Sequence, residues 1–154
     1  MTLHFAYGSN MSRTLMRLRC PAATALGPAR LDGYRFIITR DGYASVEPAT
    51  GQAVHGVLWR LTPRDLSALN AYESLDSGLY LRRILPVRRG ARCEPALIYV
   101  APDRRRGRPR PGYHDIIVAS ARAWGLPEAY VQSLARWAPG GFAGMRAAAS
   151  GEIG

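Results

Sequence analysis

The sequence has no lysine, only two cysteines and only three histidines among its 154 residues. Cys20 and Cys93 lie far apart and match no metal-binding spacing, so both are expected to be buried, reduced thiols. His4, His55 and His114 are equally scattered, and none has a second ligand at the spacing that is typical of a metal site. The sequence therefore predicts no metal centre, and it supplies few residues for nucleophilic catalysis.

Long hydrophobic runs and nucleotide-binding motifs are also missing. No apolar stretch approaches the ~20 residues that cross a bilayer, and the N-terminus lacks the pattern of a secretory signal. We therefore expect a cytoplasmic protein that has no membrane partner. Neither a Walker-type phosphate loop nor a dinucleotide fingerprint is present. The two glycines that flank the serine of a nucleophile elbow are not both present around Ser9.

The positive charge consists of arginine alone, because 21 arginines against 11 acidic residues give a formal net charge of +10. A nucleic-acid partner would explain this balance, and so would an arginine-favouring genome together with an anionic small-molecule substrate. Arginine is concentrated only in residues 104–111, where Gly and Pro interrupt it and no aromatic side chains alternate with it. This pattern is typical of a solvated loop, so a nucleic-acid partner is disfavoured.

The length and an apolar fraction of 47% indicate a globular chain with a hydrophobic core. We expect a single domain over residues 1–154, with a glycine-rich tail at 142–154. Six strands are expected near residues 3–7, 29–39, 43–47, 54–61, 79–87 and 92–100, with a connection at 22–29. Helices are expected near residues 12–20, 62–73, 112–125 and 126–138.

Several of these strands are joined by tight turns. This arrangement predicts an α+β fold, a small, mostly antiparallel six-stranded β-barrel with flanking α-helices. Ser12 is expected to cap the first helix, and Thr62 followed by Pro63 is a strong start for the second. Gly56, inside a clear strand, indicates a close approach by another stretch of backbone.

Two stretches are candidates for chemistry. The first is the turn at residues 7–10, which follows a strand and can aim backbone N–H groups at an anionic or carbonyl oxygen. A plain strand-to-helix connection is the alternative. The second is Glu73, at the end of an amphipathic helix among Leu69, Leu75 and Leu79, where burial would raise its pKa toward neutrality. Its alternative is a side chain that points outward past the end of the helix.

Three motifs resemble a known family. The run Phe5-Ala6-Tyr7-Gly8-Ser9-Asn10 resembles the Tyr-Gly-Ser-Asn signature of the gamma-glutamylcyclotransferase-like superfamily. Residues 66–80 resemble its second signature, Leu-x-x-Leu-Asp-x-x-Glu-Gly followed by Gly-x-Tyr. Residues 113–130 are similar to the C-terminal helices of the gamma-glutamylcyclotransferase branch, including the junction Gly125-Leu126-Pro127. The motifs occur in the family's order, which is more specific than any one of them.

The resemblance implies an enzyme that cyclises a gamma-glutamyl amide to 5-oxoproline and releases the free amine or amino acid, with no cofactor. It places the catalytic general base and acid at Glu73. A non-catalytic domain that binds a small ligand on the same fold is the alternative. Asn70 replaces the family's Asp and Ser74 its Gly, and the second change bears on the acceptor side of the pocket. The substrate-binding residues that the resemblance implies are His4, Phe5, Ala6, Tyr7, Gly8, Ser9, Asn10, Tyr80 and Tyr113.

Overall fold

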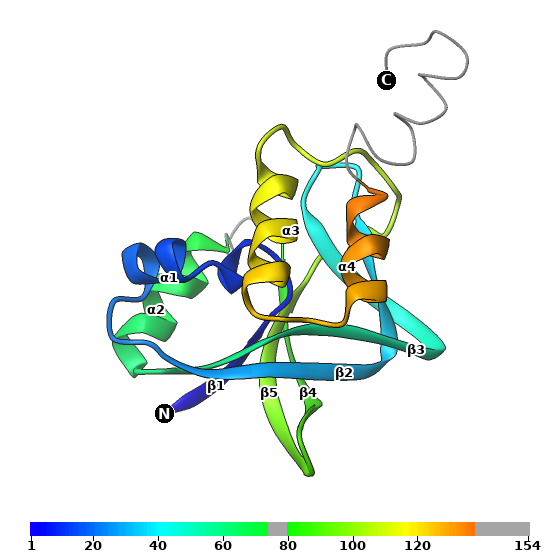
Figure 1. Cartoon of the computed structure of the whole chain (residues 1–154). Coiled ribbons are helices and arrows are strands. Elements are labelled where there is room, and N and C mark those ends of the chain that lie inside the picture. The colour runs from blue at the N-terminus through cyan, green and yellow to red at the C-terminus, as the bar shows by residue number, and fades with distance from the viewer. Residues whose placement is uncertain (74–79, 138–154) are drawn as a thin grey trace, which may run out of the picture.

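A computed structural model describes residues 1–73 and 80–137. Its strands form a closed barrel in the order β1-β3-β2-β4-β5. The strands are β1 (Thr2–Ala6), β2 (Thr24–Ile38), β3 (Ala44–Leu61), β4 (Leu81–Arg89) and β5 (Arg92–Val100). The helices are η1 (a 3-10 turn, Ser9–Met11), α1 (Arg13–Arg19), α2 (Pro63–Tyr72), α3 (Tyr113–Ala123) and α4 (Glu128–Ala135). Helices α1 and α2 lie together at one end, and α3 and α4 pack together over the barrel (Figure 1).

Two of the six predicted strands form a single strand in the structure. The stretches 43–47 and 54–61 are predicted to be separate, with Pro48 stopping the first, but both belong to β3. Pro48 has no backbone N–H to donate, and it lies exposed opposite Tyr34 of β2. The register between β2 and β3 shifts there, and pairing resumes with Asp32 opposite Ala53. The interruption is therefore a local irregularity within one long strand, and the barrel has five strands rather than six.

The barrel is also mixed rather than wholly antiparallel. β1 pairs antiparallel with β3 but parallel with β5, where His4 lies opposite Leu97. The predicted connection at 22–29 is wrong for most of its length, because β2 begins at Thr24. Gly27 has a φ of +112° next to a register shift, so the Gly-Pro pair is accommodated within the strand. The α+β class and the flanking helices are confirmed.

The two predicted helix starts are confirmed by their caps. The Ser12 side chain accepts a hydrogen bond from the Leu15 N–H at 3.2 Å, and α1 follows it. The Thr62 side chain accepts from the Asp65 N–H at 3.1 Å, and Pro63 is the first residue of α2. These caps satisfy backbone donors that the first turn of a helix leaves unpaired.

Gly56 lies where β3 passes close to the end of β1. A Cβ atom at this position would lie 2.3 Å from the carbonyl oxygen of Ala6 and 2.8 Å from Cζ of Phe5. The predicted close backbone approach is therefore confirmed. It matters for the site because β1 leads directly into the turn at residues 7–10.

The predictions for the cysteines and the tail have different outcomes. Cys20 is buried, as expected, and its thiol donates to the carbonyl oxygen of Asp65 at 3.5 Å. Cys93 is exposed, so the prediction that it is buried is wrong: its strand, β5, buries the residues from Ala96 to Tyr99 instead. The predicted tail at 142–154 lies outside the described residues. Within the described part, no helix is long and apolar enough to cross a membrane.

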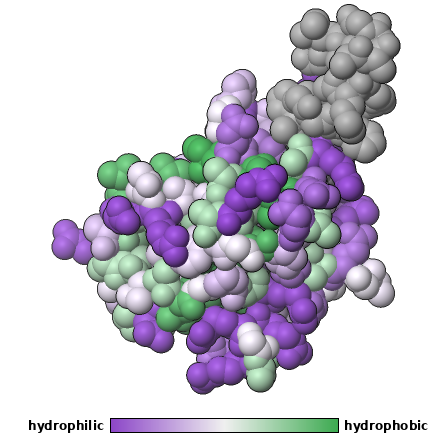
Figure 2. All heavy atoms as spheres, viewed as in Figure 1, coloured by the Kyte–Doolittle hydropathy of each residue, from purple (hydrophilic) through white to green (hydrophobic). Residues whose placement is uncertain are grey.

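The arginine-rich segment at 104–111 is exposed for most of its length, but it is also anchored. The Arg106 guanidinium binds the Glu47 carboxylate at 2.7 Å, and Arg35 binds the same carboxylate from β2. Arg110 donates to the carbonyl oxygen of Asp41 at 2.9 Å and lies over the Tyr43 ring. Hydrophilic residues cover much of the face shown in Figure 2. The segment is therefore a surface loop fixed to the turn between β2 and β3.

Glu47→Gln is expected to lower the free energy of unfolding by about 1–2 kcal/mol near neutral pH. The hydrogen bond from Arg106, followed by that from Arg35, lowers the pKa of Glu47 from 4.5 to about 2. A carboxylate with a lowered folded-state pKa stabilises the fold above its unfolded pKa, and this contribution is lost as the pH falls toward 2. Urea unfolding of both proteins at neutral and strongly acidic pH measures the difference.

The matched control is Glu94→Gln. Glu94 meets Arg92 at 3.6 Å, and the Arg92 side chain is 71% exposed, so we expect a change within about 0.5 kcal/mol. A Glu47→Gln deficit of the same size in acid as at neutral pH would contradict the assignment to this ion pair.

Candidate active site

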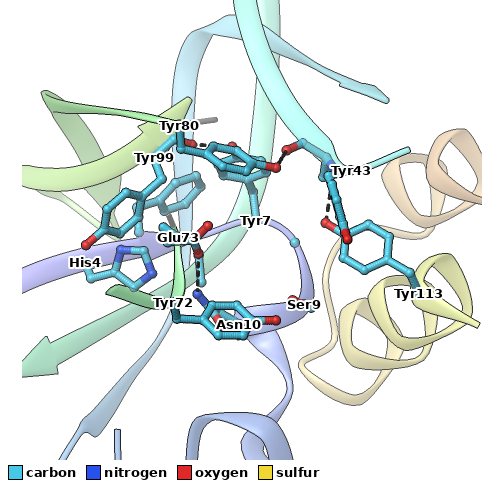
Figure 3. Close-up of a pocket in the computed structure, with 14 residues that line it drawn as sticks. His4, Tyr7, Ser9, Asn10, Tyr43, Tyr72, Glu73, Tyr80, Tyr99 and Tyr113 are labelled. Carbon is cyan, nitrogen blue, oxygen red and sulfur yellow. Dashed lines mark hydrogen bonds between the residues drawn. The ribbon is translucent and has the colours of Figure 1, made fainter. Parts of the chain in front are cut away.

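The predicted site residues line one cavity with a volume of about 250 Å³. It opens between the end of β1, the start of β3, the end of α2 and the start of α3. All ten predicted residues lie on its wall: His4, Phe5, Ala6, Tyr7, Gly8, Ser9, Asn10, Glu73, Tyr80 and Tyr113. Four further lining residues were not predicted from the sequence: Tyr43, Ala44, Tyr72 and Tyr99. The cavity thus joins chain segments from both ends of the described sequence (Figure 3).

The turn after β1 forms one wall. β1 is buried from His4 to Ala6, and the chain then bends into η1, closed by a hydrogen bond from Met11 N–H to Gly8 oxygen at 3.1 Å. A Cβ at Gly8 would lie 3.3 Å from the Tyr113 hydroxyl. Glycine therefore keeps the space between the turn and α3 open for a ligand.

Glu73 forms the opposing wall. It caps the C-terminus of α2, where its N–H donates to the carbonyl oxygen of Leu69 at 2.9 Å. Its side chain points into the cavity, and Oε1 accepts a hydrogen bond from Asn10 Nδ2 at 3.2 Å (Figure 3). Of the two alternatives at this position, the inward orientation is the one observed. The predicted neighbours Leu75 and Leu79 lie outside the described residues.

The environment of Glu73 brings its pKa close to neutral pH. Burial raises its pKa from 4.5 to about 7, while the charge of Arg19 and the hydrogen bond from Asn10 oppose that rise. The cavity wall around it is rich in tyrosine rather than in leucine. A carboxyl group with this pKa can both accept and return a proton at neutral pH.

Three tyrosine hydroxyls are hydrogen-bonded to backbone groups around the cavity (Figure 3). The Tyr7 hydroxyl donates to the carbonyl oxygen of Tyr99, and the Tyr80 hydroxyl donates to that of Ala44 at 2.8 Å. The Tyr113 hydroxyl accepts from the Ala44 N–H at 3.0 Å. Burial raises the pKa values of Tyr7, Tyr80 and Tyr113. These phenols are therefore neutral hydrogen-bonding groups rather than bases.

His4 is also neutral. Its Nδ1–H donates to the carbonyl oxygen of Leu97 at 3.1 Å, which leaves a lone pair on Nε2. Burial lowers the pKa of His4 to about 4, so the imidazole carries no charge at neutral pH. Its ring packs edge-on against Tyr99, with centroids 5.5 Å apart. Among the described residues of the cavity wall, Glu73 is thus the group that titrates near pH 7.

Nothing in the local sequence distinguishes the missed residues. Tyr99 lies in a strand where aromatic residues are common, and Tyr43 follows an ordinary Asp-Gly turn. Tyr72 was visible as a neighbour of Glu73, but it lies half exposed at the rim. Asn70, which stands where the family motif has Asp, takes part in a hydrogen bond at the site. Its Oδ1 accepts from the Tyr99 hydroxyl at 2.5 Å. Ser74 lies outside the described residues.

Metal-ligating side chains are not grouped in the described residues. No three of the His, Cys, Asp and Glu side chains there are placed to hold a metal ion together. His114, for example, is engaged at Nε2 with the carbonyl oxygen of Leu134 at 2.5 Å. The chemistry that the cavity can perform is therefore built on one carboxyl group, neutral hydroxyls and backbone N–H groups.

Comparisons with known proteins agree with this geometry. The gamma-glutamylcyclotransferase of Mus musculus is 27% identical over 155 residues, which covers 92% of this chain and 81% of that protein. The gamma-glutamylcyclotransferase of Bos taurus is 28% identical over 153 residues with the same coverage. A solved structure of a gamma-glutamyl cyclotransferase superposes with a TM-score of 0.81 at 27% identity, covering 86% of this chain and 85% of that one.

A family profile gives the assignment directly. The profile described as "Gamma-glutamyl cyclotransferase, AIG2-like" matches residues 4–124. This range contains the turn after β1, Glu73, Tyr80 and Tyr113, which are the residues that the resemblance singled out. The chain belongs to the gamma-glutamyl cyclotransferase, AIG2-like family.

Proposed function

We propose that this protein is a gamma-glutamyl cyclotransferase, which converts a gamma-glutamyl amide into 5-oxoproline and a free amine or amino acid. The observation that carries the proposal is the position of Glu73. It faces the turn at residues 7–10 across the cavity and is joined to it by the 3.2 Å hydrogen bond from Asn10, 63 residues away in the chain. A buried carboxyl group with a pKa of about 7 suits a reaction in which protons are both taken and returned.

The reaction needs no nucleophile from the enzyme, because the substrate's own α-amine attacks its γ-carbonyl carbon. A carbon–nitrogen bond forms within the glutamyl group, and the bond to the leaving nitrogen breaks. Glu73, ionised, takes a proton from the attacking nitrogen and then gives a proton to the leaving one. The carboxylate is therefore regenerated in each cycle. The absence of a paired Ser–His or Cys–His in the cavity wall described above is compatible with this chemistry.

Most of the acceleration would come from holding the glutamyl chain in a folded conformation. Well-oriented intramolecular reactions gain up to ~7–11 kcal/mol from proximity, and general acid–base catalysis adds roughly 10²–10⁴-fold. The lining residues lie on or next to strands and helix ends. Rigid walls of this kind favour one bound conformation.

Polar groups that could hold the substrate's oxygens lie around the turn. Within the described residues, the backbone N–H groups of Ser9 and Asn10 have no hydrogen-bond acceptor. The Tyr113 hydroxyl accepts from the Ala44 N–H, so its own proton is available to a ligand. We assign the substrate's α-carboxylate or its developing oxyanion to these donors.

The test is a screen of gamma-glutamyl conjugates with 5-oxoproline as the measured product. Amino acids, polyamines and larger amines should be represented among the leaving groups, since the acceptor side of the cavity is the open question. Release of 5-oxoproline from one class, with saturation kinetics, is expected. Calorimetry on the same panel tests the alternative. Tight binding without turnover of any conjugate would favour a non-catalytic binding domain.

A further inference from the structure

Arg19 contacts the turn at residues 7–10, which forms one wall of the cavity. It is the last residue of α1, and its guanidinium donates from one nitrogen to Ser9 Oγ at 3.1 Å and to Asn10 Oδ1 at 2.5 Å. The other terminal nitrogen donates to the Tyr72 hydroxyl, and the guanidinium carbon lies 3.8 Å from the centroid of the Tyr72 ring. Arg19 does not line the cavity itself. It therefore contacts three residues that line the cavity without lining the cavity itself.

These contacts determine which end of the Asn10 amide faces Glu73. A guanidinium has only donors, so the atom of Asn10 that meets it must be the carbonyl oxygen. The amide nitrogen is then turned toward Glu73, and it donates to Oε1 at 3.2 Å. In the flipped amide, the nitrogen would face the guanidinium and the oxygen would face the carboxylate, so both contacts would be repulsive. Without Arg19, only the contact with Glu73 would oppose that flip.

The charge of Arg19 acts on the same carboxyl group. Within residues 1–73 and 80–137, Arg19 has no carboxylate partner at salt-bridge distance. Its positive charge is therefore not neutralised by a nearer acid in that part of the chain. It opposes the effect of burial on the pKa of Glu73, as does the Asn10 hydrogen bond that it orients. Both effects favour the ionised form of Glu73.

We propose that Arg19 is a positioning residue for Glu73: through Asn10 it fixes the orientation of the carboxyl group, and its charge favours the ionised form that accepts the substrate's proton. The inference rests on the proposed function, since it assigns Arg19 a part in that reaction. Arginine suits this position better than lysine, because its planar group bonds Ser9, Asn10 and Tyr72 at once from a fixed geometry.

The first test is the pH profile of kcat/KM. In Arg19→Met, the acidic limb is expected to move to higher pH by about one unit, so activity falls about tenfold on that limb and recovers at alkaline pH. Arg19→Lys keeps the positive charge but loses the planar guanidinium that bonds several groups at once. The acidic limb of its pH profile should therefore move less, while kcat falls. Arg17→Met is the matched control: it removes the same charge from an exposed position on the same helix, and its profile should match the wild type. An unmoved limb in Arg19→Met, or an equal shift in Arg17→Met, would overturn the inference.

The second test does not depend on turnover. The chain has five glutamates, so the side-chain carboxyl carbons of ¹³C-labelled glutamate can be titrated by NMR, with Glu73→Gln identifying the Glu73 signal. The Glu73 midpoint should rise in Arg19→Met and stay in place in Arg17→Met. If the wild type turned over no gamma-glutamyl compound, the proposed function would fail while this titration still decided the role of Arg19. A Glu73 midpoint that is the same in Arg19→Met and the wild type would refute that role. Circular dichroism spectra and thermal melts ensure that the variants compared are folded.

Discussion

Glu73→Gln is expected to abolish the release of 5-oxoproline, with a loss of about 10²–10⁴-fold or more, while the protein stays folded. The amide has nearly the shape of the carboxyl group but can neither take a proton from the attacking amine nor give one to the leaving amine. His4, Tyr7, Tyr80 and Tyr113 on the described cavity wall are unable to replace it, because burial raises the pKa values of these three tyrosines and lowers that of His4. The measurement is single-substrate kinetics with the best conjugate from the screen.

Stability should change in the opposite direction to activity. Because burial raises the folded-state pKa of Glu73 from 4.5 to about 7, the fold is stabilised relative to the unfolded chain at low pH, and this contribution is lost as the pH rises through 7. Above neutrality the wild type holds a buried carboxylate, and the glutamine variant does not. Glu73→Gln is therefore expected to be more stable than the wild type at alkaline pH, by up to about 3 kcal/mol.

Glu128→Gln is the matched control for both measurements. The Glu128 side chain is 65% exposed, at the start of α4, and its carboxylate pairs with Arg122 at 3.4 Å. Neither activity nor stability should change by more than about 0.5 kcal/mol. A Glu73→Gln enzyme that retained full activity would exclude the proposed mechanism. An inactive variant that remained folded and still bound a gamma-glutamyl conjugate would be its strongest support.

Gly56→Ala is expected to have the largest effect on folding, a loss of about 3 kcal/mol or more in the free energy of unfolding. The added methyl would lie 2.3 Å from the carbonyl oxygen of Ala6, which is backbone and cannot rotate away. It would also press on Phe5, which is fully buried in the core. β1 would have to move away from β3, and the turn at residues 7–10 would move with it. Activity should therefore fall together with stability.

Gly90→Ala separates this clash from the general cost of replacing a glycine. Gly90 has a φ of +61° in the turn between β4 and β5, and a Cβ there would meet nothing within 4 Å. The left-handed conformation alone should cost about 1–2 kcal/mol. Chemical denaturation of both variants gives the comparison. Equal losses would show that crowding at the β1–β3 contact is not the cause.

Features set by a few neighbouring residues could be predicted from the sequence. Ser12 and Thr62 start their helices because a side-chain oxygen satisfies a donor in the first turn, and this depends on residues only three positions apart. Gly56 stood out because a glycine inside a strong strand needs a packing reason. The inward orientation of Glu73 was one of two open alternatives, since helical spacing alone does not fix the direction of a residue at a helix end.

Features set by distant pairing could not be predicted in the same way. The continuity of β3 through Pro48 depends on the register against β2, and the parallel contact between β1 and β5 brings residues 4 and 97 together. Tyr99 reaches the site through the contact between β1 and β5, and Arg19 reaches it from the end of α1. Neither residue is marked by its own neighbours in the chain. The family motifs located Glu73 and the turn at residues 7–10, whereas the barrel determined which other side chains surround them.

His4 gives the folding of this protein a functional readout. The same residue pairs with β5 to close the barrel and lines the cavity, and its ring bonds the Leu97 carbonyl oxygen 93 positions away. Contacts of such high sequence separation form slowly, because a long loop must close before they contribute. We therefore expect the cavity to be completed late in folding, so that the return of the proposed activity during refolding would follow the closure of the barrel rather than the earlier formation of helices.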